Sequence, residues 1–222
     1  MLSVVIPTLN AGPELPALIA TLKTVADEVV VSDGGSTDNT RNVALHAGAI
    51  VIHTEQGRGT QLAAGAEAAR GDWLFFLHAD SRLGQGWQTV LRDFLADPLN
   101  QYWGAYFKLR FDDDSKWARR LERIVAWRSR RLGLPYGDQG LVINRTLYDQ
   151  AGGYPPIQIM EDVALVRAVG QRWLRVLDAQ IITSAERYQK AGWRRRSLRN
   201  LFCLGLYFLG VSPRRIARIY NG

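Results

Sequence analysis

A single acidic residue behind a short apolar run is the first chemical signal in the sequence. Residues 73–77 are apolar and preceded by Gly71, which is typical of a buried strand in a parallel sheet, and Asp80 follows in a His-Ala-Asp triplet. In open α/β sheets ligands bind outside the carboxyl ends of the strands, so we expect Asp80 beside a ligand. A carboxylate there suits a hard divalent cation shared with a phosphate group. The triplet alone leaves an alternative open, in which Asp80 caps a helix that starts near Gly86.

A sheet must position this residue, because the first 80 residues alternate between strand and helix patterns. Strands are predicted at residues 2–6, 28–32, 49–53 and 73–77, with helices between them at 13–26, 36–48 and 60–70. Helical crossovers between strands imply a parallel sheet covered on both faces. Farther along, the pattern predicts a helix at 86–97, a half-buried strand at 103–111 and a helix over about 115–132.

Three further loops fall on the same rim of the predicted sheet as Asp80. They follow the first three strands and read Pro7-Thr8-Leu9-Asn10, Asp33-Gly34-Gly35-Ser36 and Gly57-Arg58-Gly59. Asp33 can accept a hydrogen bond from a base or a ribose hydroxyl, Gly34 lets the backbone approach closely, and Arg58 can pair with a diphosphate. No Gly-x-Gly-x-x-Gly follows the first strand and no P-loop is present, so both of those nucleotide-binding classes are disfavoured.

Chain length, charge and cysteine content limit the number of domains and the cellular compartment that we expect. The 222 residues suit one domain, or one domain with an appendage, and carry a net charge of +7. Residues 190–222 hold eight basic side chains and no acidic one, which leaves a net charge of −1 for the rest of the chain. Cys203 is the only cysteine, so an intrachain disulfide is excluded and a reducing, cytoplasmic compartment is expected.

Taken together, the motifs resemble a known family. The segments Ser-Val-Val-Ile-Pro-Thr-Leu-Asn at 3–10 and Val-Val-Ser-Asp-Gly-Gly-Ser-Thr-Asp at 30–38, followed by the triplet at 78–80, are similar in order and spacing to family 2 glycosyltransferases of the GT-A fold. The resemblance extends to about Tyr188. Within the family the chain is most similar to a small bacterial subgroup of uncertain substrate, which carries a Gly-Arg-Gly-x-Gln segment, here at 57–61.

This resemblance implies a fold and a division of the chain. We expect a GT-A-like α/β domain over residues 1–189, built on a mixed, mainly parallel sheet flanked by helices. A basic helical extension would follow over residues 190–222. The implied activity is transfer of a sugar, with inversion, from a UDP- or GDP-type nucleotide-diphosphate sugar to a hydroxyl acceptor.

The resemblance also implies a donor site that holds a metal ion. The residues predicted to line the nucleotide pocket are Pro7, Thr8, Asn10, Asp33, Gly34 and Arg58. Asp80 matches the last acid of the Asp-x-Asp motif and would hold Mn²⁺ or Mg²⁺ against the diphosphate. His78 stands where an acid is usual, and no histidine follows it in the chain. Metal binding is therefore expected to rest on Asp80, phosphates and waters, with His78 in the core.

Two later segments resemble the acceptor side of the family's site. In the Gly-Asp-Gln-Gly segment at 137–140, Asp138 and Gln139 are predicted to bind the acceptor. Glu161 and Asp162 match the family's Glu-Asp motif, with Asp162 as the general base that takes the proton from the attacking hydroxyl. The alternative is that both carboxylates only complement the positive end of a helix at 163–169.

The C-terminal segment is both apolar and basic. Residues 198–211 are rich in Leu, Phe and Tyr, and they fall short of the roughly 20 residues that span a bilayer. A basic helix with aromatic side chains can lie in the interface of an anionic membrane, which predicts peripheral association at the inner face and a lipid-linked or membrane-proximal acceptor. The alternative is a helix docked on the domain, or on a second subunit in a homodimer. No nucleic-acid readout motif accompanies the basic residues, so nucleic acid is not an expected partner.

Two other functions remain open at this stage. A sugar-phosphate nucleotidyltransferase has a similar sheet, but its Gly-rich loop is expected after the first strand, whereas Gly57 and Gly59 follow the third. A non-catalytic nucleotide-sugar binding module is the other alternative, and His78 in place of an acid is the feature that favours it.

Overall fold

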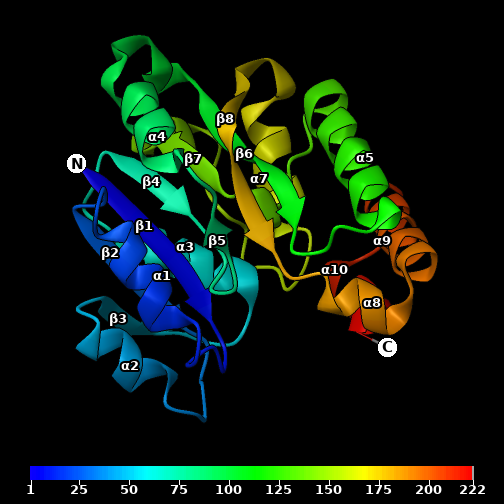
Figure 1. The fold of residues 1–222 in the computed structure, drawn as a ribbon, viewed down its shortest axis with the longest axis horizontal. Helices are drawn as coiled ribbons and strands as arrows, with labels where there is room; N and C mark the ends of the chain where they lie inside the picture. Colours follow the sequence, from blue (N-terminus) through cyan, green and yellow to red (C-terminus); the bar gives the residue numbers. More distant parts are fainter. Residues whose placement is uncertain (222) are drawn as a thin grey trace.

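Four apolar runs in the first half of the chain form the parallel part of one sheet. They are β1 (Leu2–Thr8), β2 (Glu28–Asp33), β3 (Ile50–His53) and β4 (Trp73–Phe76). β1 pairs in parallel with both β2 and β4, and β2 pairs in parallel with β3. The four carboxyl ends therefore lie on one rim, as the alternation of strand and helix patterns predicts. The structure is a computed structural model and describes residues 1–221 (Figure 1).

The second half of the chain extends this sheet in mixed orientation. Its strands are β5 (Arg82–Leu83), β6 (Gly104–Phe111), β7 (Leu141–Asn144) and β8 (Leu174–Thr183). Over the described residues the strand order is β3-β2-β1-β4-β7-β6-β8-β5, with β7 antiparallel to both β4 and β6 and β8 parallel to β6. The predicted mixed α/β fold is confirmed, whereas β5, β7 and β8 were not identified in the sequence.

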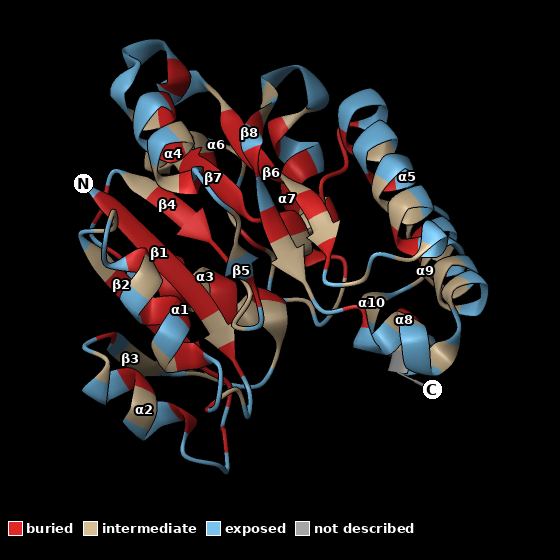
Figure 2. Cartoon of the chain, in the orientation of Figure 1, coloured by how far each residue is buried: buried red, intermediate tan, exposed pale blue. Residues whose placement is uncertain are grey.

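Helices cover both faces of the sheet. They are α1 (Leu15–Leu22), α2 (Thr40–His46), α3 (Arg58–Ala68), α4 (Trp87–Ala96), α6 (Arg145–Gln150) and α7 (Glu161–Val169). Successive strand residues point to opposite faces, so Phe75 belongs to the core under α1 and α4, while Leu74 and Phe76 belong to the core under α3, α6 and α7. Buried residues accordingly fill the central strands (Figure 2).

The remaining helices lie side by side at one end of the sheet (Figure 1). They are α5 (Lys116–Leu132), α8 (Glu186–Ala191), α9 (Trp193–Phe208) and α10 (Pro213–Asn221). The predicted helix at 198–211 is α9, which begins earlier and includes the three consecutive arginines. Cys203 and Leu204 of α9 pack with Val163 of α7 and Ile216 of α10, so the extension is docked on the domain.

The predicted division of the chain falls inside a helix. The expected boundary between residues 189 and 190 lies within α8, and the last residue of the predicted extension, Gly222, lies outside the described residues. The division into two parts stays a prediction. Within residues 1–221, no helix is both long and apolar enough to cross a membrane.

Candidate active site

The loop after β2 is organised around a buried carboxylate. Asp33 accepts hydrogen bonds from the backbone N–H groups of Gly35 (3.1 Å) and Ser36 (2.9 Å). It also accepts from the hydroxyl of Thr8 on β1, at 3.2 Å. Burial raises the pKa of Asp33, but the hydrogen bonds outweigh burial and the net pKa lies below its ordinary value. Asp33 is therefore ionised and holds its own loop in shape, and its contact with a base stays a prediction.

Asn10 joins this loop to the one after β1. Its backbone is left-handed (φ 53°), a conformation that asparagine tolerates better than most residues. Its side-chain oxygen accepts from the backbone N–H of Thr37 (2.9 Å), and its own N–H donates to the hydroxyl of Ser36 (2.9 Å). The predicted nucleotide residues of these two loops are thus brought together: Pro7, Thr8, Asn10, Asp33 and Gly34.

Gln61 holds the ends of β1 and β2 from beneath, a role that the sequence did not reveal. This buried amide donates to the carbonyl of Thr8 (2.7 Å) and to the carbonyl of Ser32 (2.9 Å). A Cβ atom at Gly34 would lie 2.9 Å from the amide carbon of Gln61, so the glycine is required for this packing. The only signal in the sequence was the place of Gln61 in the Gly-Arg-Gly-x-Gln segment.

The start of α3 contacts the segment ahead of α7. The guanidinium Nε of Arg58 lies 3.6 Å from a carboxylate oxygen of Glu161. One residue on, Gly59 donates its N–H to the carbonyl of Ile157 (3.1 Å). Burial lowers the pKa of Arg58, whereas the nearby acids, Glu161 and Asp162 first, raise it. Together the acids outweigh burial, so the net pKa of Arg58 lies above its ordinary value. Arg58 thus stands as a permanent cation among carboxylates.

His78 is a neutral histidine within the site. Burial, reinforced by the charges of Arg58 and Arg187, lowers its pKa to about 3. The imidazole of His78 lies directly against Gly137. A Cβ atom added at Gly137 would lie only 2.7 Å from His78 Nε2 and 3.6 Å from an oxygen of Asp162. The expectation that His78 lies in the core is therefore wrong: the histidine is half-buried and packs against the acceptor-side loop, where glycine leaves it room.

Asp80 lies exposed at the rim, just beyond β4. The helix that follows, α4, has Gly86 at its N-cap and no side-chain cap, so the interpretation of Asp80 as a helix cap is wrong. Among residues 1–221, no group of three or more His, Cys, Asp or Glu side chains is arranged to hold a metal ion. One or two carboxylates suffice for Mg²⁺ when substrate phosphates and waters complete its coordination, and Asp80 fits that requirement.

Asp138 is a half-buried acid next to the same group of charges. Burial raises its pKa to about 6, opposed by the charge of Arg128 and reinforced by that of Asp162. Its Oδ1 atom is buried and has no hydrogen-bond partner among the described residues. The cation that faces it is fixed, because the guanidinium of Arg128 stacks 3.3 Å from the ring centre of Tyr136. An acid with unused acceptor capacity suits a donor from a ligand, and its acceptor role stays a prediction.

Gln139, predicted beside Asp138 as an acceptor ligand, is turned away into the core. Only 1% of its surface is exposed. Its amide donates to the carbonyl of Phe107 (3.1 Å) and accepts from the hydroxyl of Ser129 (2.8 Å). These bonds attach the loop at 137–140 to β6 and α5, so the structure gives Gln139 a positioning task.

Asp162 has its carboxylate held by two backbone N–H groups at the start of α7. One oxygen accepts from Gly137 (2.8 Å) and the other from Val163 (2.7 Å). The N-cap residue of α7, Met160, has a left-handed backbone (φ 68°), a costly conformation for a residue of this kind. The two acids do lie at the helix N-terminus, as the alternative interpretation expected, but the bond to Gly137 also joins Asp162 to the loop that carries Asp138.

Glu161 is the most deeply buried acid of the site. It is 1% exposed, and one of its oxygens has no hydrogen-bond partner within the described part of the chain. Burial and the nearby charge of Asp162 raise its pKa to about 8, although Arg58 acts in the opposite direction. Glu161 therefore holds a proton near neutral pH, and Asp162 beside it accepts the two backbone N–H bonds described above.

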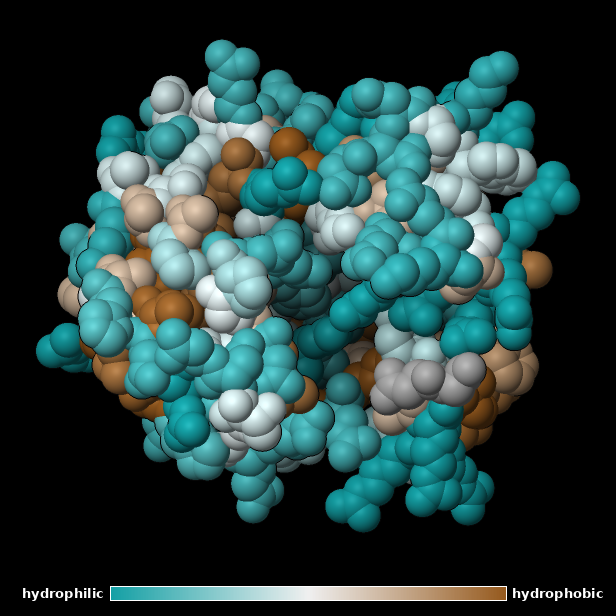
Figure 3. Space-filling model, turned by 60° about the horizontal axis from the view of Figure 1, so that its bottom comes forward, coloured by the Kyte–Doolittle hydropathy of each residue, from teal (hydrophilic) through white to brown (hydrophobic). Residues whose placement is uncertain are grey.

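The C-terminal extension reaches this site, which no pattern in the sequence indicated. Tyr220 of α10 lies close enough to Arg58 to affect its pKa. The side chain of Tyr220 also packs with the cluster that contains Met160 and Val163. On the face that Figure 3 brings forward, the molecule is hollowed near its middle, with mostly hydrophilic side chains around the recess.

Comparison with known proteins gives this arrangement a family context. The model of "Glycosyl transferase family 2" matches residues 3–155. A PGL/p-HBAD biosynthesis glycosyltransferase of Mycobacterium bovis is 41% identical over 93 residues, which is 37% of this chain and 36% of that protein. A glucosyl-3-phosphoglycerate synthase of Mycolicibacterium paratuberculosis is 34% identical over 92 residues, 36% of this chain and 28% of that protein. The chain thus spans about a third of the length of these relatives.

Solved structures share the fold at low sequence identity. A mannosyl-3-phosphoglycerate synthase from Rubrobacter xylanophilus has a TM-score of 0.64 and 18% identity, over 95% of this chain and 75% of that one. A glucosyl-3-phosphoglycerate synthase from Mycobacterium tuberculosis, in complex with Mn²⁺, UDP-glucose and phosphoglyceric acid, has a TM-score of 0.59 and 21% identity, over 81% of this chain and 70% of that one. At these identities the similarity supports the fold.

We expect Gly59→Ala to destabilise the protein. The added Cβ would overlap the carbonyl oxygens of Pro155 and Ile157, lying 2.6 Å from the latter, and backbone cannot rotate away as a side chain can. The expected loss is about 1–3 kcal/mol of unfolding free energy, or roughly 2–12 °C in Tm. Gly205→Ala on α9 is the matched control, because its Cβ would meet no described atom within 4 Å. Equal melting temperatures for the two variants would contradict the proposed packing.

Replacing Glu161 is expected to change how stability depends on pH. Between its ordinary pKa of 4.5 and its folded pKa of about 8, the folded state keeps a proton that the unfolded state has released. Unfolding free energy therefore falls as pH rises through this window. Glu161→Gln removes this contribution, so its Tm relative to the unmodified protein should rise between about pH 5 and about pH 9. Glu67→Gln, at an exposed position on α3, is the control, and a parallel pH profile for Glu161→Gln would refute the assignment.

Proposed function

We propose, since this chain belongs to glycosyl transferase family 2, that it transfers a sugar from a nucleotide-diphosphate sugar to a hydroxyl acceptor with inversion at the anomeric carbon. The observation that carries the proposal is the placement of Asp162. Its carboxylate is held by backbone N–H groups at the rim where Arg58, His78, Asp80 and Asp138 also meet. A fixed carboxylate among these groups suits a general base.

The donor would lie across the loops after β1, β2 and β3. Thr8, Asn10 and Asp33 belong to one hydrogen-bonded platform, with Pro7 and Gly34 within it, which supports their assignment to the nucleoside. Arg58 is a cation at this rim and would pair with the diphosphate. Because the glucosyl-3-phosphoglycerate synthase of similar fold was solved with UDP-glucose, we propose a UDP-sugar as the first donor to test, and a GDP-sugar as the second.

Asp80 would hold Mn²⁺ or Mg²⁺ together with the donor diphosphate. The fit rests on its exposed carboxylate just beyond the carboxyl end of β4, and Mn²⁺ accompanies UDP-glucose in the related structure. When bound, such an ion offsets the negative charge that develops on the departing diphosphate. The remaining chemistry belongs to the side chains of the chain.

In the proposed reaction, Asp162 accepts the proton of the acceptor hydroxyl while the hydroxyl oxygen bonds to the anomeric carbon. The bond to the diphosphate breaks on the opposite side, which inverts the configuration of that carbon. Glu161, protonated and buried beneath Asp162, contacts Arg58 and would position it, so that its catalytic contribution is indirect. Asp138, with its unpaired oxygen, would accept a hydrogen bond from the acceptor, and Gln139 would keep that loop in place.

The acceptor is proposed to be lipid-linked or close to a membrane, with the protein at the inner face in the cytoplasm. The basic C-terminal extension supports this proposal, because Tyr220 on its inner side packs with the cluster that contains Met160 and Val163, next to Asp162. A homodimer formed through the same extension is the competing arrangement.

Asp162→Asn should lower the rate of UDP release from UDP-glucose by about 10²- to 10⁴-fold, since the amide cannot accept the proton. The Asn oxygen can still accept one backbone N–H bond, so the fold should be retained. Asp149→Asn, at an exposed position on α6, is the matched control. Unchanged slow turnover in Asp162→Asn would favour a non-catalytic binding module, and pyrophosphate release from a nucleoside triphosphate would favour a nucleotidyltransferase.

A nucleoside diphosphate should stabilise the protein in a metal-dependent way. A ligand at about 100 times its Kd adds about 2.7 kcal/mol, which corresponds to a Tm shift of roughly 5–10 °C for a chain of this size. We expect the shift for UDP, compared with GDP, dTDP and CDP, to increase with Mn²⁺ and to lose that increase in Asp80→Ala. Asp93→Ala, exposed on α4, is the control. No shift with any of the four nucleotides would contradict the donor site.

A further inference from the structure

Exposed apolar side chains gather on α9. Leu198, Leu201 and Phe202 are 66%, 65% and 57% exposed, and Leu209 just beyond the helix is 82% exposed. At about 100° per residue these positions share one side of the helix. The opposite side carries the buried Cys203, so α9 is docked on the domain through one face and presents a second apolar face outward.

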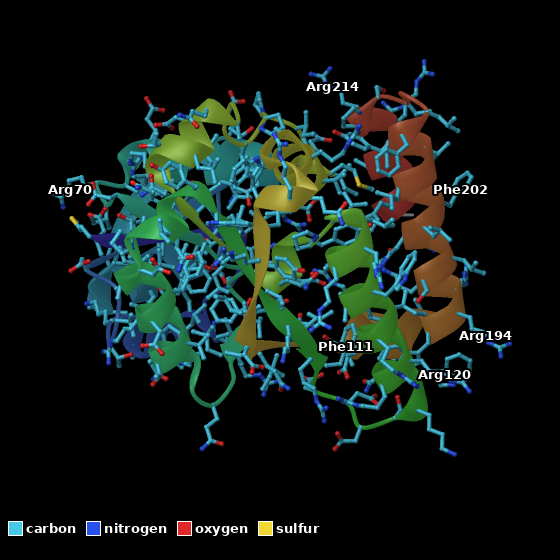
Figure 4. All side chains as sticks on the ribbon, turned by 90° about the horizontal axis from the view of Figure 1, so that it is seen from above. Arg70, Phe111, Arg120, Arg194, Phe202 and Arg214 are labelled. Carbon is cyan, nitrogen blue, oxygen red and sulfur yellow. The ribbon has the colours of Figure 1, made fainter. Side chains whose placement is uncertain are left out.

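The outer side of α5 continues this surface. Ile124 and Trp127 are 59% and 58% exposed and lie one helical turn apart. Trp117, at the start of α5, lies between two guanidinium groups: that of Arg120 is 5.2 Å from the ring centre and that of Arg194 on α9 is 4.8 Å from it. These stacked contacts join the two helices, and Figure 4 shows Arg120, Arg194 and Phe202 along the same outer edge of the molecule.

We call this surface the α5–α9 face. Its apolar members are Trp117, Ile124, Trp127, Leu198, Leu201, Phe202 and Leu209. Its exposed basic members are Lys116, Arg120, Arg123, Arg130, Arg131, Arg194 and Arg195.

The charges of the α5–α9 face have one sign. No Asp or Glu occurs in α9, and the acid of α5, Glu122, is turned inward, where it accepts from the backbone N–H of Phe111 (2.8 Å) and from Arg119 (2.7 Å). A second copy of the chain docked on this face would set arginines against arginines. A surface of negative charge with an apolar layer beneath it would satisfy both kinds of side chain.

The geometry points to an anionic phospholipid bilayer as the partner of the α5–α9 face, with the apolar side chains inserted among the lipids and the basic ones at the phosphate level. This contact would place the site next to the bilayer, because the inner side of α9 packs with Val163, beside Asp162. Delivery of a lipid-borne acceptor rests on the proposed function, whereas the binding itself does not.

Flotation of the full chain with vesicles tests the inference. We expect recovery with vesicles of phosphatidylcholine that contain about one quarter phosphatidylglycerol, weakening as salt is added, and no recovery with phosphatidylcholine alone. The double variant Leu201→Asn and Phe202→Asn should bind about tenfold more weakly or worse. The matched control is Leu45→Asn with Leu99→Asn. Leu45, on α2, is 55% exposed, and Leu99, in the 3₁₀ helix Pro98–Tyr102 after α4, is 69% exposed.

Equal binding by the two double variants, or no binding to the anionic vesicles, would overturn the proposal. So would sedimentation that shows a dimer without lipid, dissociated by the Leu201 and Phe202 changes, because the face would then be an interface between copies. Nucleotide-induced Tm shifts serve as the separate readout: their retention in a variant that no longer binds vesicles is the expected result. Their absence from the unmodified protein would speak against the donor site alone and would leave the vesicle result standing.

Discussion

The site depends on a contact between two parts of the chain that are about a hundred residues apart. Gly59 lies against the carbonyl groups of Pro155 and Ile157, and Arg58 faces Glu161. The first interaction requires the absence of a side chain, and the second places the guanidinium of Arg58 beside the two adjacent acids at the start of α7. Together they hold the parallel half of the sheet, with its three rim loops, in register with the start of α7. Asp162 is positioned by this arrangement and by the N–H of Gly137.

Burial is the main cause of the shifted pKa values at this rim, and neighbouring charges add to it or oppose it. Burial and neighbouring carboxylates raise the pKa of Glu161 to about 8 and that of Asp138 to about 6. His78, half-buried near Arg58, remains neutral. Added positive charge at this rim would be stabilised by the carboxylates, while Arg58 keeps an anionic group attracted to the same place. A nucleotide diphosphate bound together with a divalent cation satisfies both requirements.

Helix α9 of the C-terminal extension has two apolar sides, an inner one that packs on the domain and an outer one that is exposed. Through its inner side α9 completes the core that carries Val163 and Met160, so it contributes to the region around the acids. Its outer side joins α5 through Trp117 and is bordered by arginines. The sequence analysis treated membrane contact and docking on the domain as alternatives. The structure shows the docking and leaves the outer side free, since one helix presents different faces to different surroundings.

Local sequence determined the strand ends and the residue types placed there. An apolar run followed by a polar residue specifies both a buried strand and what stands at its carboxyl end, which is why Asp33, Asp80 and the parallel part of the sheet could be predicted. The mixed character of the sheet was an expectation from the family resemblance. The resemblance to a family added the pair at 161–162. Only the tertiary structure decided which side chains meet: that Gln139 turns into the core, that Gln61 joins two strands, and that α10 reaches the site. Periodicity reports the burial of one element at a time, whereas these contacts depend on how distant elements pack, and packing is a property of the whole fold.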